Sequence, residues 1–379
     1  MGETLKELDR SEKLDWIRLI RTNSVGPVTF QRLLTRYGTA KDAIAALPDL
    51  AKTAGRKTLL KPPSREEAEY ELNAAEQVGA KAVAMIEPDY PALLRTITDP
   101  PPILYGVGHL SLLEKPAVAL VGARNASAAG RRIAGDFARD LGNAGYVVVS
   151  GLARGIDGAA HTNSLDNGTI AVVAGGVDVI YPPEHLELTR DIARRGLIVS
   201  ERPPGAQPTA RDFPRRNRLI SGLSLAVVVI EAAMRSGTLI TARTAADQGR
   251  EVFAVPGSPL DPRCKGSNNL IRDGAGLAES AEDIIQSLSH RIDSVKENER
   301  DYFAALDSTP KGDTNETEED IALQVKETIR ELMSPTPIHR DEIIRASKAG
   351  PGLVADALLE LVLAGEVIEE YGGFFAQKT

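Results

Sequence analysis

Two groups of anion-seeking residues flank one apolar run in the middle of the sequence. The run, Leu225 to Ile230, is mostly β-branched and typical of a parallel strand that is buried on both faces. Arg215-Arg216-Asn217-Arg218 precede it, and Ser236-Gly237-Thr238 open a predicted helix over 239–248. A helix start offers free N–H groups and the positive end of the helix dipole, so it suits an anion. The stretch therefore predicts a phosphate site, without saying whose phosphate.

Apolar, β-rich segments alternate with helical segments through the centre of the chain. The predicted strands cover residues 117–121, 147–150, 170–174, 197–200, 225–230 and 252–255. The predicted helices cover residues 128–144, 156–166, 184–195 and 239–248. This alternation predicts an α/β fold with a Rossmann-like, doubly wound and mainly parallel sheet. Ligands of such sheets bind beyond the carboxyl ends of the strands, so residues at these ends are the candidates.

Small residues and arginines follow the predicted strands at those ends. Arg124 and Ser127 follow the first strand, and Ser150-Gly151, Arg154 and Gly155 follow the second. Any one glycine can serve only a turn, but glycines at successive strand ends let a backbone or a ligand come close. Together with two arginines in register, the set predicts a binding rim.

Catalytic candidates are fewer. His161 follows Asp157 by one helical turn, so the two share a face and can form an acid–base pair or brace the preceding loop. We favour the bracing role, and give the same role to Asp178, Glu201 and Glu231, which follow predicted strands. The sequence holds no phosphate-binding P-loop, no nucleophile elbow and no Cys/His cluster with metal spacing. We therefore predict no catalytic residue, metal or cofactor.

Composition limits the partners. Only 4% of the 379 residues are aromatic, so we expect no rich base-stacking platform. The formal net charge is −8, so any nucleic-acid binding must come from a local patch. Such a patch lies between Arg202 and Arg218, where five arginines face one acid, Asp212. The single cysteine, Cys264, and the absence of an apolar run of membrane-spanning length predict a cytoplasmic protein without membrane insertion.

We place the central domain at residues 65–288. The segments before and after it predict two further, smaller domains. Residues 1–64 form a helical domain whose Val25-Gly26-Pro27-Val28 turn can hold a nucleic-acid backbone through its amides, although simple packing is the alternative we favour. Polar residues 289–320 form a flexible linker. Residues 321–379 predict a winged helix. Its third helix, over 353–364, has no Lys or Arg and carries Asp356 and Glu360, which favours a protein contact over DNA reading.

Seven sequence motifs follow one another through the central region. They are SGLARGID at 150–157, GGVDVIYP at 175–182, SERPPG at 200–205, FPRRNRLISGLS at 213–224, EAAMRSGTLITA at 231–242, AVPGS at 254–258 and KGSNNLI at 265–271. The chain resembles the DNA-processing protein A (DprA, also called Smf) family through this central region, and more weakly at both flanks. The resemblance implies a homodimer that binds single-stranded DNA without sequence preference. It also implies loading of RecA recombinase in natural transformation and homologous recombination, without catalytic turnover.

The resemblance also implies site residues. Arg124, Arg154, the FPRRNR arginines and Lys265-Gly266-Ser267 would lie in the DNA pocket, and Ser236-Gly237-Thr238 would hold a phosphate. Ala123 departs from the family, which often has Ser there. Two alternatives remain open. One is a nucleotide-processing, phosphoribohydrolase-like enzyme with Glu231 or Asp178 as base, and the other is a winged-helix transcription regulator.

Overall fold

The structure is a computed structural model that describes residues 5–53, 60–289, 316–370 and 372–378. It divides into two compact units. The central unit comprises residues 71–97 and 103–302, and the flanking unit comprises residues 1–70, 98–102 and 303–379. No helix in the described ranges is long and apolar enough to cross a membrane.

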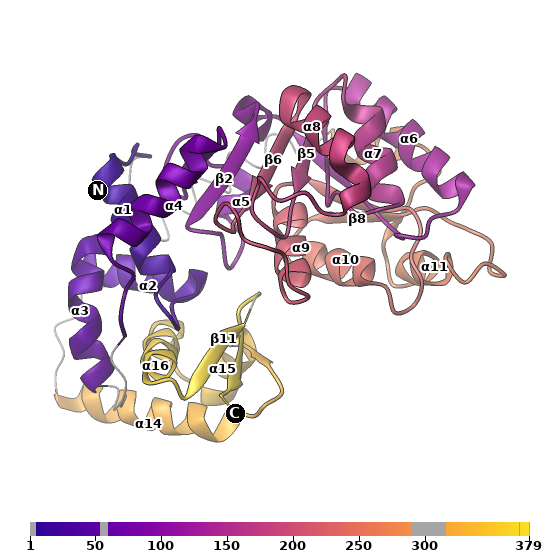
Figure 1. The fold of residues 1–379 in the computed structure, drawn as a ribbon. Coiled ribbons are helices and arrows are strands. Elements are labelled where there is room, and N and C mark those ends of the chain that lie inside the picture. The colour runs from indigo at the N-terminus through magenta and orange to yellow at the C-terminus, as the bar shows by residue number, and fades with distance from the viewer. Residues whose placement is uncertain (1–4, 54–59, 290–315, 371, 379) are drawn as a thin grey trace. The chain divides into compact units, whose positions relative to one another are not determined.

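A nine-stranded sheet runs through the central unit (Figure 1). Its strands are β1 (Lys81–Ala84), β2 (Ile103–Gly108), β3 (Ala117–Val121), β4 (Val147–Ser150), β5 (Thr169–Val172), β6 (Leu197–Ser200), β7 (Ala226–Val229), β8 (Glu251–Ala254) and β9 (Gly276–Leu277). The order is β1-β2-β6-β5-β4-β3-β7-β8-β9. The strands from β6 to β9 in this order pair in parallel, while β1 pairs antiparallel with β2, and β2 with β6. The predicted α/β fold with a mainly parallel sheet is confirmed.

The strand order reverses between β3 and β7. The chain adds β4, β5 and β6 on one side of β3 and then returns to place β7 on the other side. Val121 pairs with Val229, so the loops after β3 and β7 leave the sheet side by side. Such a switch point opens a crevice at the carboxyl ends of the strands, where ligands of doubly wound sheets bind.

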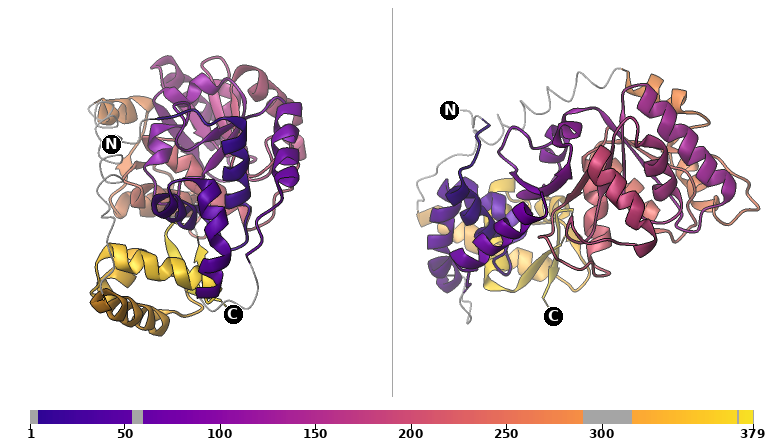
Figure 2. Two further views of the ribbon diagram at one scale, coloured as in Figure 1. Left: turned by 90° about the vertical axis from the view of Figure 1, so that its left-hand side faces the viewer. Right: turned by 45° about the horizontal axis from the view of Figure 1, so that its top comes forward.

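Helices cover both faces of the sheet. On one face, α6 (Ala128–Asn143), α7 (Ile156–Ser164) and α12 (Ala281–Leu288) pack through side chains such as Phe137 and Ile284. The right-hand view of Figure 2 shows α6 and α12 at the upper right, close together although far apart in sequence. The helices α9 (Asp212–Gly222) and α10 (Gly237–Asp247) lie on the other side of the sheet from α6 and α7 (Figure 1). The remaining elements are α5 (Ala92–Arg95), η1 (Leu110–Glu114), η2 (Pro183–His185), α8 (Leu186–Arg195) and α11 (Lys265–Arg272).

Some elements of the central unit were not predicted, chiefly β2 and α9. β2 begins directly after the Pro-rich segment 88–102, which masks its strand character, and its place is fixed by antiparallel pairing with β1 and β6. α9 contains Phe213 and Pro214, and proline reads as a helix breaker. In the first turn of a helix, however, proline costs no hydrogen bond.

The flanking unit contains the terminal domains. The N-terminal helices are α1 (Arg10–Ile20), α2 (Pro27–Tyr37) and α3 (Ala40–Thr53), while α4 (Arg65–Gln77) begins in this unit and ends within the residues of the central unit. The C-terminal elements are α14 (Glu316–Leu332), β10 (Ile338–His339), α15 (Arg340–Ser347), α16 (Pro351–Ala364), β11 (Val367–Glu370) and β12 (Phe374–Gln377). Three helices with a β10-β12-β11 sheet form the predicted winged helix. α14 starts at Glu316, within the predicted linker, and the linker residues 290–315 lie outside the described residues.

Candidate nucleic-acid interface

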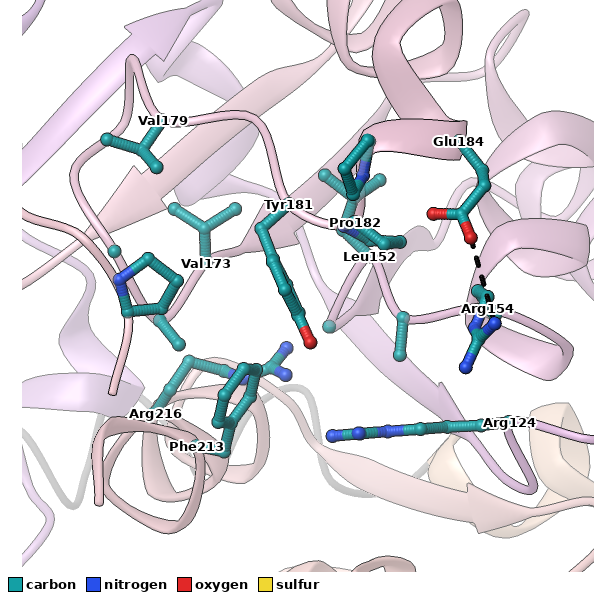
Figure 3. A pocket seen from close by; sticks show the side chains of 16 residues that line it. Arg124, Leu152, Arg154, Val173, Val179, Tyr181, Pro182, Glu184, Phe213 and Arg216 are labelled. Carbon is teal, nitrogen blue, oxygen red and sulfur yellow. Dashed lines mark ion pairs between the residues drawn. The ribbon is translucent and has the colours of Figure 1, made fainter. Parts of the chain in front are cut away.

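Two adjoining cavities lie at the carboxyl ends of the strands. The first, of about 200 Å³, follows β4 and β5 and is shown in Figure 3. The second, of about 510 Å³, lies at the switch point between β3 and β7. Arg124, Phe213 and Arg216 line both cavities, so the two form one continuous surface.

Arg124, Tyr181 and Phe213 lie together at this surface, where Arg124 and Tyr181 are exposed and Phe213 is half-buried. The Arg124 guanidinium lies 5.3 Å from the centroid of the Phe213 ring, a cation–π distance. The Tyr181 and Phe213 rings lie 5.5 Å apart at an interplanar angle of 55°. In Figure 3 the Tyr181 ring reaches into the cavity toward Arg124 and Phe213. Flat cationic and aromatic faces of this kind suit a nucleobase.

Sequence reasoning did not select Tyr181 or Phe213 as site residues. The low aromatic content argued against a rich stacking platform, but a few rings suffice when the fold gathers them. Both residues stand inside motifs that the sequence offers, GGVDVIYP and FPRRNR. Arg235, which lines the second cavity, was also missed although it directly precedes Ser236.

Arg154 is the second predicted arginine on the rim. Its side chain is 62% exposed and its guanidinium lies 3.7 Å from the Glu184 carboxylate. An exposed pair of this kind contributes little to stability, so the guanidinium can exchange Glu184 for a phosphate at small cost.

The loop between Ser150 and Gly155 is held by side chains of α7. Asp157 accepts hydrogen bonds from the amides of Gly151 at 3.1 Å and Ala153 at 3.3 Å. His161 Nε2 accepts one from the Leu152 amide at 3.3 Å. Leu152 has a positive φ of 55°, so this backbone is strained and needs such support. The structure thus places Asp157 and His161 in the bracing position.

Arg216 fills the space beneath this loop. It is buried, and its Nη1 donates to the Val172 carbonyl at 2.8 Å. A Cβ at residue 151 would lie 1.8 Å from Nη1, which explains why Gly151 stands there. Burial lowers the pKa of Arg216 to about 10, against the opposing effect of Asp157, so the group stays charged at neutral pH. Burial also raises the pKa of Asp157, although Arg216 and the loop amides oppose this.

Arg218 points into the protein as well. Its side chain is 3% exposed and forms an ion pair with Glu201. The hydroxyls of Ser150 and Ser267 are buried too, and donate to the carbonyls of Leu120 and Cys264. These predicted site residues lie near the surface loops, but their side chains already have internal partners.

The start of α6 is closed by an internal carboxylate. Glu231 accepts hydrogen bonds from the Ser127 amide at 3.0 Å and the Ser127 hydroxyl at 2.5 Å. Ser127 in turn accepts one from the Gly130 amide at 2.8 Å. Both oxygens of Glu231 are therefore engaged, which disfavours the general-base role of the enzyme alternative. Asp178 likewise braces a loop, through the Gly205 amide at 2.8 Å.

The start of α10 is open by comparison. Ser236 caps the helix through the Thr238 amide, and Thr238 Oγ1 donates to the Gly122 carbonyl at 3.2 Å. Gly237 is exposed, and no atom lies within 4 Å of the position of an added Cβ. Arg235 and Arg263 line the same cavity. A helix start with open access and two nearby cations can receive a phosphate.

Two other predicted groups, Lys265-Gly266 and Asn217, lie on α11 and α9. Lys265 is exposed at the start of α11, and the Gly266 amide donates to the Ala232 carbonyl at 2.7 Å. Asn217, on α9, lines the second cavity. Within the described part of the chain, no cluster of three or more His, Cys, Asp or Glu residues could hold a metal ion.

Three family models match the chain. The model of DNA recombination-mediator protein A matches residues 81–289, which include both cavities. The chain belongs to this family. The DprA-like N-terminal HHH domain matches residues 10–74, and the DprA winged helix domain matches residues 315–373. The resemblance seen in the sequence is thereby confirmed.

Relatives of the family align over most of the chain. Protein Smf of Synechocystis is 34% identical over 396 residues, covering 96% of this chain and 98% of its own. DNA processing protein DprA of Bacillus subtilis is 43% identical over 223 residues, covering 58% and 75%.

Two solved structures of the family share the fold. The Streptococcus pneumoniae DprA structure has a TM-score of 0.61 at 36% identity and covers 74% of this chain and 98% of its own. The Helicobacter pylori protein, whose structure concerns its single-stranded DNA binding mode, has a TM-score of 0.51 at 31% identity, covering 55% and 95%.

Arg218→Ala should destabilise the fold rather than act on a ligand directly. It leaves the Glu201 carboxylate without the Arg218 guanidinium in a poorly hydrated position, so the free energy of unfolding should fall by about 3 kcal/mol. Urea denaturation measures this loss, and a second change, Glu201→Gln, should restore part of it. Equal stability of Arg218→Ala and the parent protein would contradict the internal role.

His161 should make the fold sensitive to acid. Burial lowers the pKa of His161 to about 3, below its ordinary value of about 6.5. Between these two values the unfolded chain binds a proton that the folded chain does not. The free energy of unfolding should therefore fall by about 1.4 kcal/mol for each pH unit lost in that range.

The matching variant is His161→Gln, which removes the titrating group. Its unfolding free energy, measured in urea at about pH 7.5 and about pH 5, should depend less steeply on pH than that of the parent. Parallel pH profiles of the two proteins would show that His161 is not held neutral in the fold.

Proposed function

We propose that this protein binds single-stranded DNA without sequence preference and loads RecA recombinase onto it during homologous recombination, including natural transformation. The observation that carries the proposal is the stacking surface of Arg124, Phe213 and Tyr181 above the first cavity. Membership of the recombination-mediator family supports it, as does the single-stranded DNA binding of the H. pylori relative.

Lack of sequence preference follows from the chemistry of the surface. Every base has a π-face, so stacking on Arg124 and Phe213 accepts any of them. Both side chains line the two cavities, so a base stacked on them would lie beside both pockets. A strand can therefore be held by its bases without any reading of base edges.

The phosphates of the strand have their own contacts. The open start of α10, with Arg235, is suited to one phosphate, and the exposed Arg154 and Lys265 to others. With a net charge of −8, the chain relies on these local cations, so binding should depend strongly on salt. Arg216 is buried beneath the loop from Ser150 to Gly155. It supports this loop, and its positive charge favours a phosphate in the cavities that it lines.

The remaining features of the proposal come from the family resemblance. We propose that the protein acts in the cytoplasm as a homodimer and without catalytic turnover. A dimer would present two copies of a small cationic patch to one strand, which raises the overall affinity through effective concentration. The engagement of both Glu231 oxygens supports the lack of turnover.

Phe213→Ala and Arg124→Ala should weaken binding in two distinguishable ways. Phe213→Ala removes one stacking face, so affinity for a fluorescent oligothymidylate should fall by about 1 kcal/mol or more with an unchanged salt dependence. Arg124→Ala removes a cation as well, so the slope of log K against log salt should shrink by about 0.7 if Arg124 neutralises one phosphate. Fluorescence anisotropy at several salt concentrations measures both quantities.

Arg139→Ala is the matched control for charge. Arg139 is exposed on α6, about 17 Å along the helix from its start, and pairs locally with Asp136. Its loss should leave affinity and salt slope near the parent values. If Arg139→Ala weakens binding as much as Arg124→Ala, or if the losses differ between oligonucleotide sequences, the proposed surface is wrong.

A further inference from the structure

A wing residue of the C-terminal domain meets the N-terminal turn within the flanking unit. Glu369, on β11, accepts hydrogen bonds from the amides of Val28 at 3.0 Å and Thr29 at 3.1 Å. The Thr29 hydroxyl donates to the same carboxylate at 2.5 Å. One carboxylate thus takes three donors at the start of α2.

The turn itself leaves this position open to an anion. Gly26 is the N-cap of α2 and supplies no side-chain acceptor, and Pro27 follows it. The first amides of α2 therefore depend on an acceptor from elsewhere. A Cβ at residue 26 would lie 2.7 Å from Glu369 Oε1, although the φ of Gly26, −91°, is ordinary. The glycine is needed because the carboxylate comes so close, not because of its backbone conformation.

A second contact holds the wing at the turn between β11 and β12. Asp99 accepts a hydrogen bond from the Gly372 amide at 2.9 Å, at the turn between β11 and β12. Burial raises the pKa of Glu369, and the like charge of Asp99 adds to this, although the hydrogen bonds from Thr29 and Val28 oppose it. Within the described residues no Lys or Arg forms an ion pair with Glu369. The carboxylate is held by neutral donors alone, which makes it exchangeable for another anion.

The third helix of the winged helix, α16, is covered by the N-terminal helices α2 and α3. Val354 and Leu358 belong to the core of the winged helix, while Leu359 and Leu363 are also buried but lie outside that core. Arg32 of α2 is attracted by Asp356 of α16. The face that a winged helix would offer to a DNA groove is thus occupied by the N-terminal helices.

We propose that the wing is a latch in which Glu369 occupies a phosphate seat of the N-terminal turn, so that the wing and a nucleic-acid backbone compete for the amides of Val28 and Thr29. The partner of the winged helix is then the N-terminal domain of the same chain. The proposal depends on the proposed function only for the choice of nucleic acid as the competing anion.

Glu369→Gln in the full chain tests the latch directly. Loss of the charge weakens the contact, so hydrogen exchange at the amides of Val28 and Thr29 should become faster. Exposure of the seat to phosphate should raise the affinity for a fluorescent oligothymidylate about two- to fivefold. Adding Gly26→Asp to this variant should cancel the gain, because a carboxylate at the N-cap refills the seat locally.

The matched control is Glu370→Gln. It removes the same charge from the next residue of β11, whose side chain points to the opposite face of the strand. This variant should change neither the exchange of the two amides nor the affinity. Unchanged amide exchange in Glu369→Gln would overturn the latch, and this result does not depend on DNA. An equal affinity gain in both variants, or no gain in Glu369→Gln, would overturn the phosphate seat.

Discussion

The burial of the Arg216 guanidinium is the interaction on which the rest of the site depends. It joins α9 to the end of β5 through the Val172 carbonyl, and it lies against Gly151 and near Asp157. A charged group can stay inside only where carbonyls and a carboxylate surround it. This requirement fixes the loop after β4 and the first turn of α9, and so places Phe213 beside Arg124 at the mouth of both cavities.

The free amides at loop and helix starts follow a common pattern. Glu231 takes the amide of Ser127 at the start of α6, Asp157 takes loop amides before α7, and Glu369 takes those of α2. The start of α10 has a serine cap and open space beside Gly237 instead. Carboxylates of the chain thus bind the free amides at three of these four starts. The start of α10 has no such carboxylate and lies beside Arg235 and Arg263 in the cavity at the switch point. Under the proposed function, the open start of α10 would receive a phosphate of the strand although the chain carries a net charge of −8.

Much of the fold was predictable because buried parallel strands have a distinctive composition. The runs at 117–121, 147–150 and 197–200 coincide with β3, β4 and β6. The antiparallel edge was not predicted, since β2 follows a Pro-rich segment and its position depends on pairing with distant strands. The helix α9 was missed because the local sequence around Pro214 reads as a break, while the buried Leu219 and Ile220 favour helix through packing.

The site was predictable at the level of motifs but not of individual roles. Strand-end positions located Arg124, Arg154 and Ser236–Thr238, which do lie at the rim. Sequence spacing cannot separate Arg215, which is half-buried, from the buried Arg216 and Arg218, because burial depends on how α9 lies on the sheet. Tyr181 reaches the site through a loop after β5, so its proximity to Phe213 comes from tertiary structure alone.

The most direct test of the account is the location of a bound strand on the central domain. An oligothymidylate carrying a photoreactive base, cross-linked to the full chain and mapped by mass spectrometry, reports which side chains touch the bases. The account predicts adducts on the peptides that contain Tyr181 and Phe213, with loss of both when excess unlabelled single strand is added. Adducts confined to the N-terminal helices or the winged helix, with none at these two residues, would contradict it.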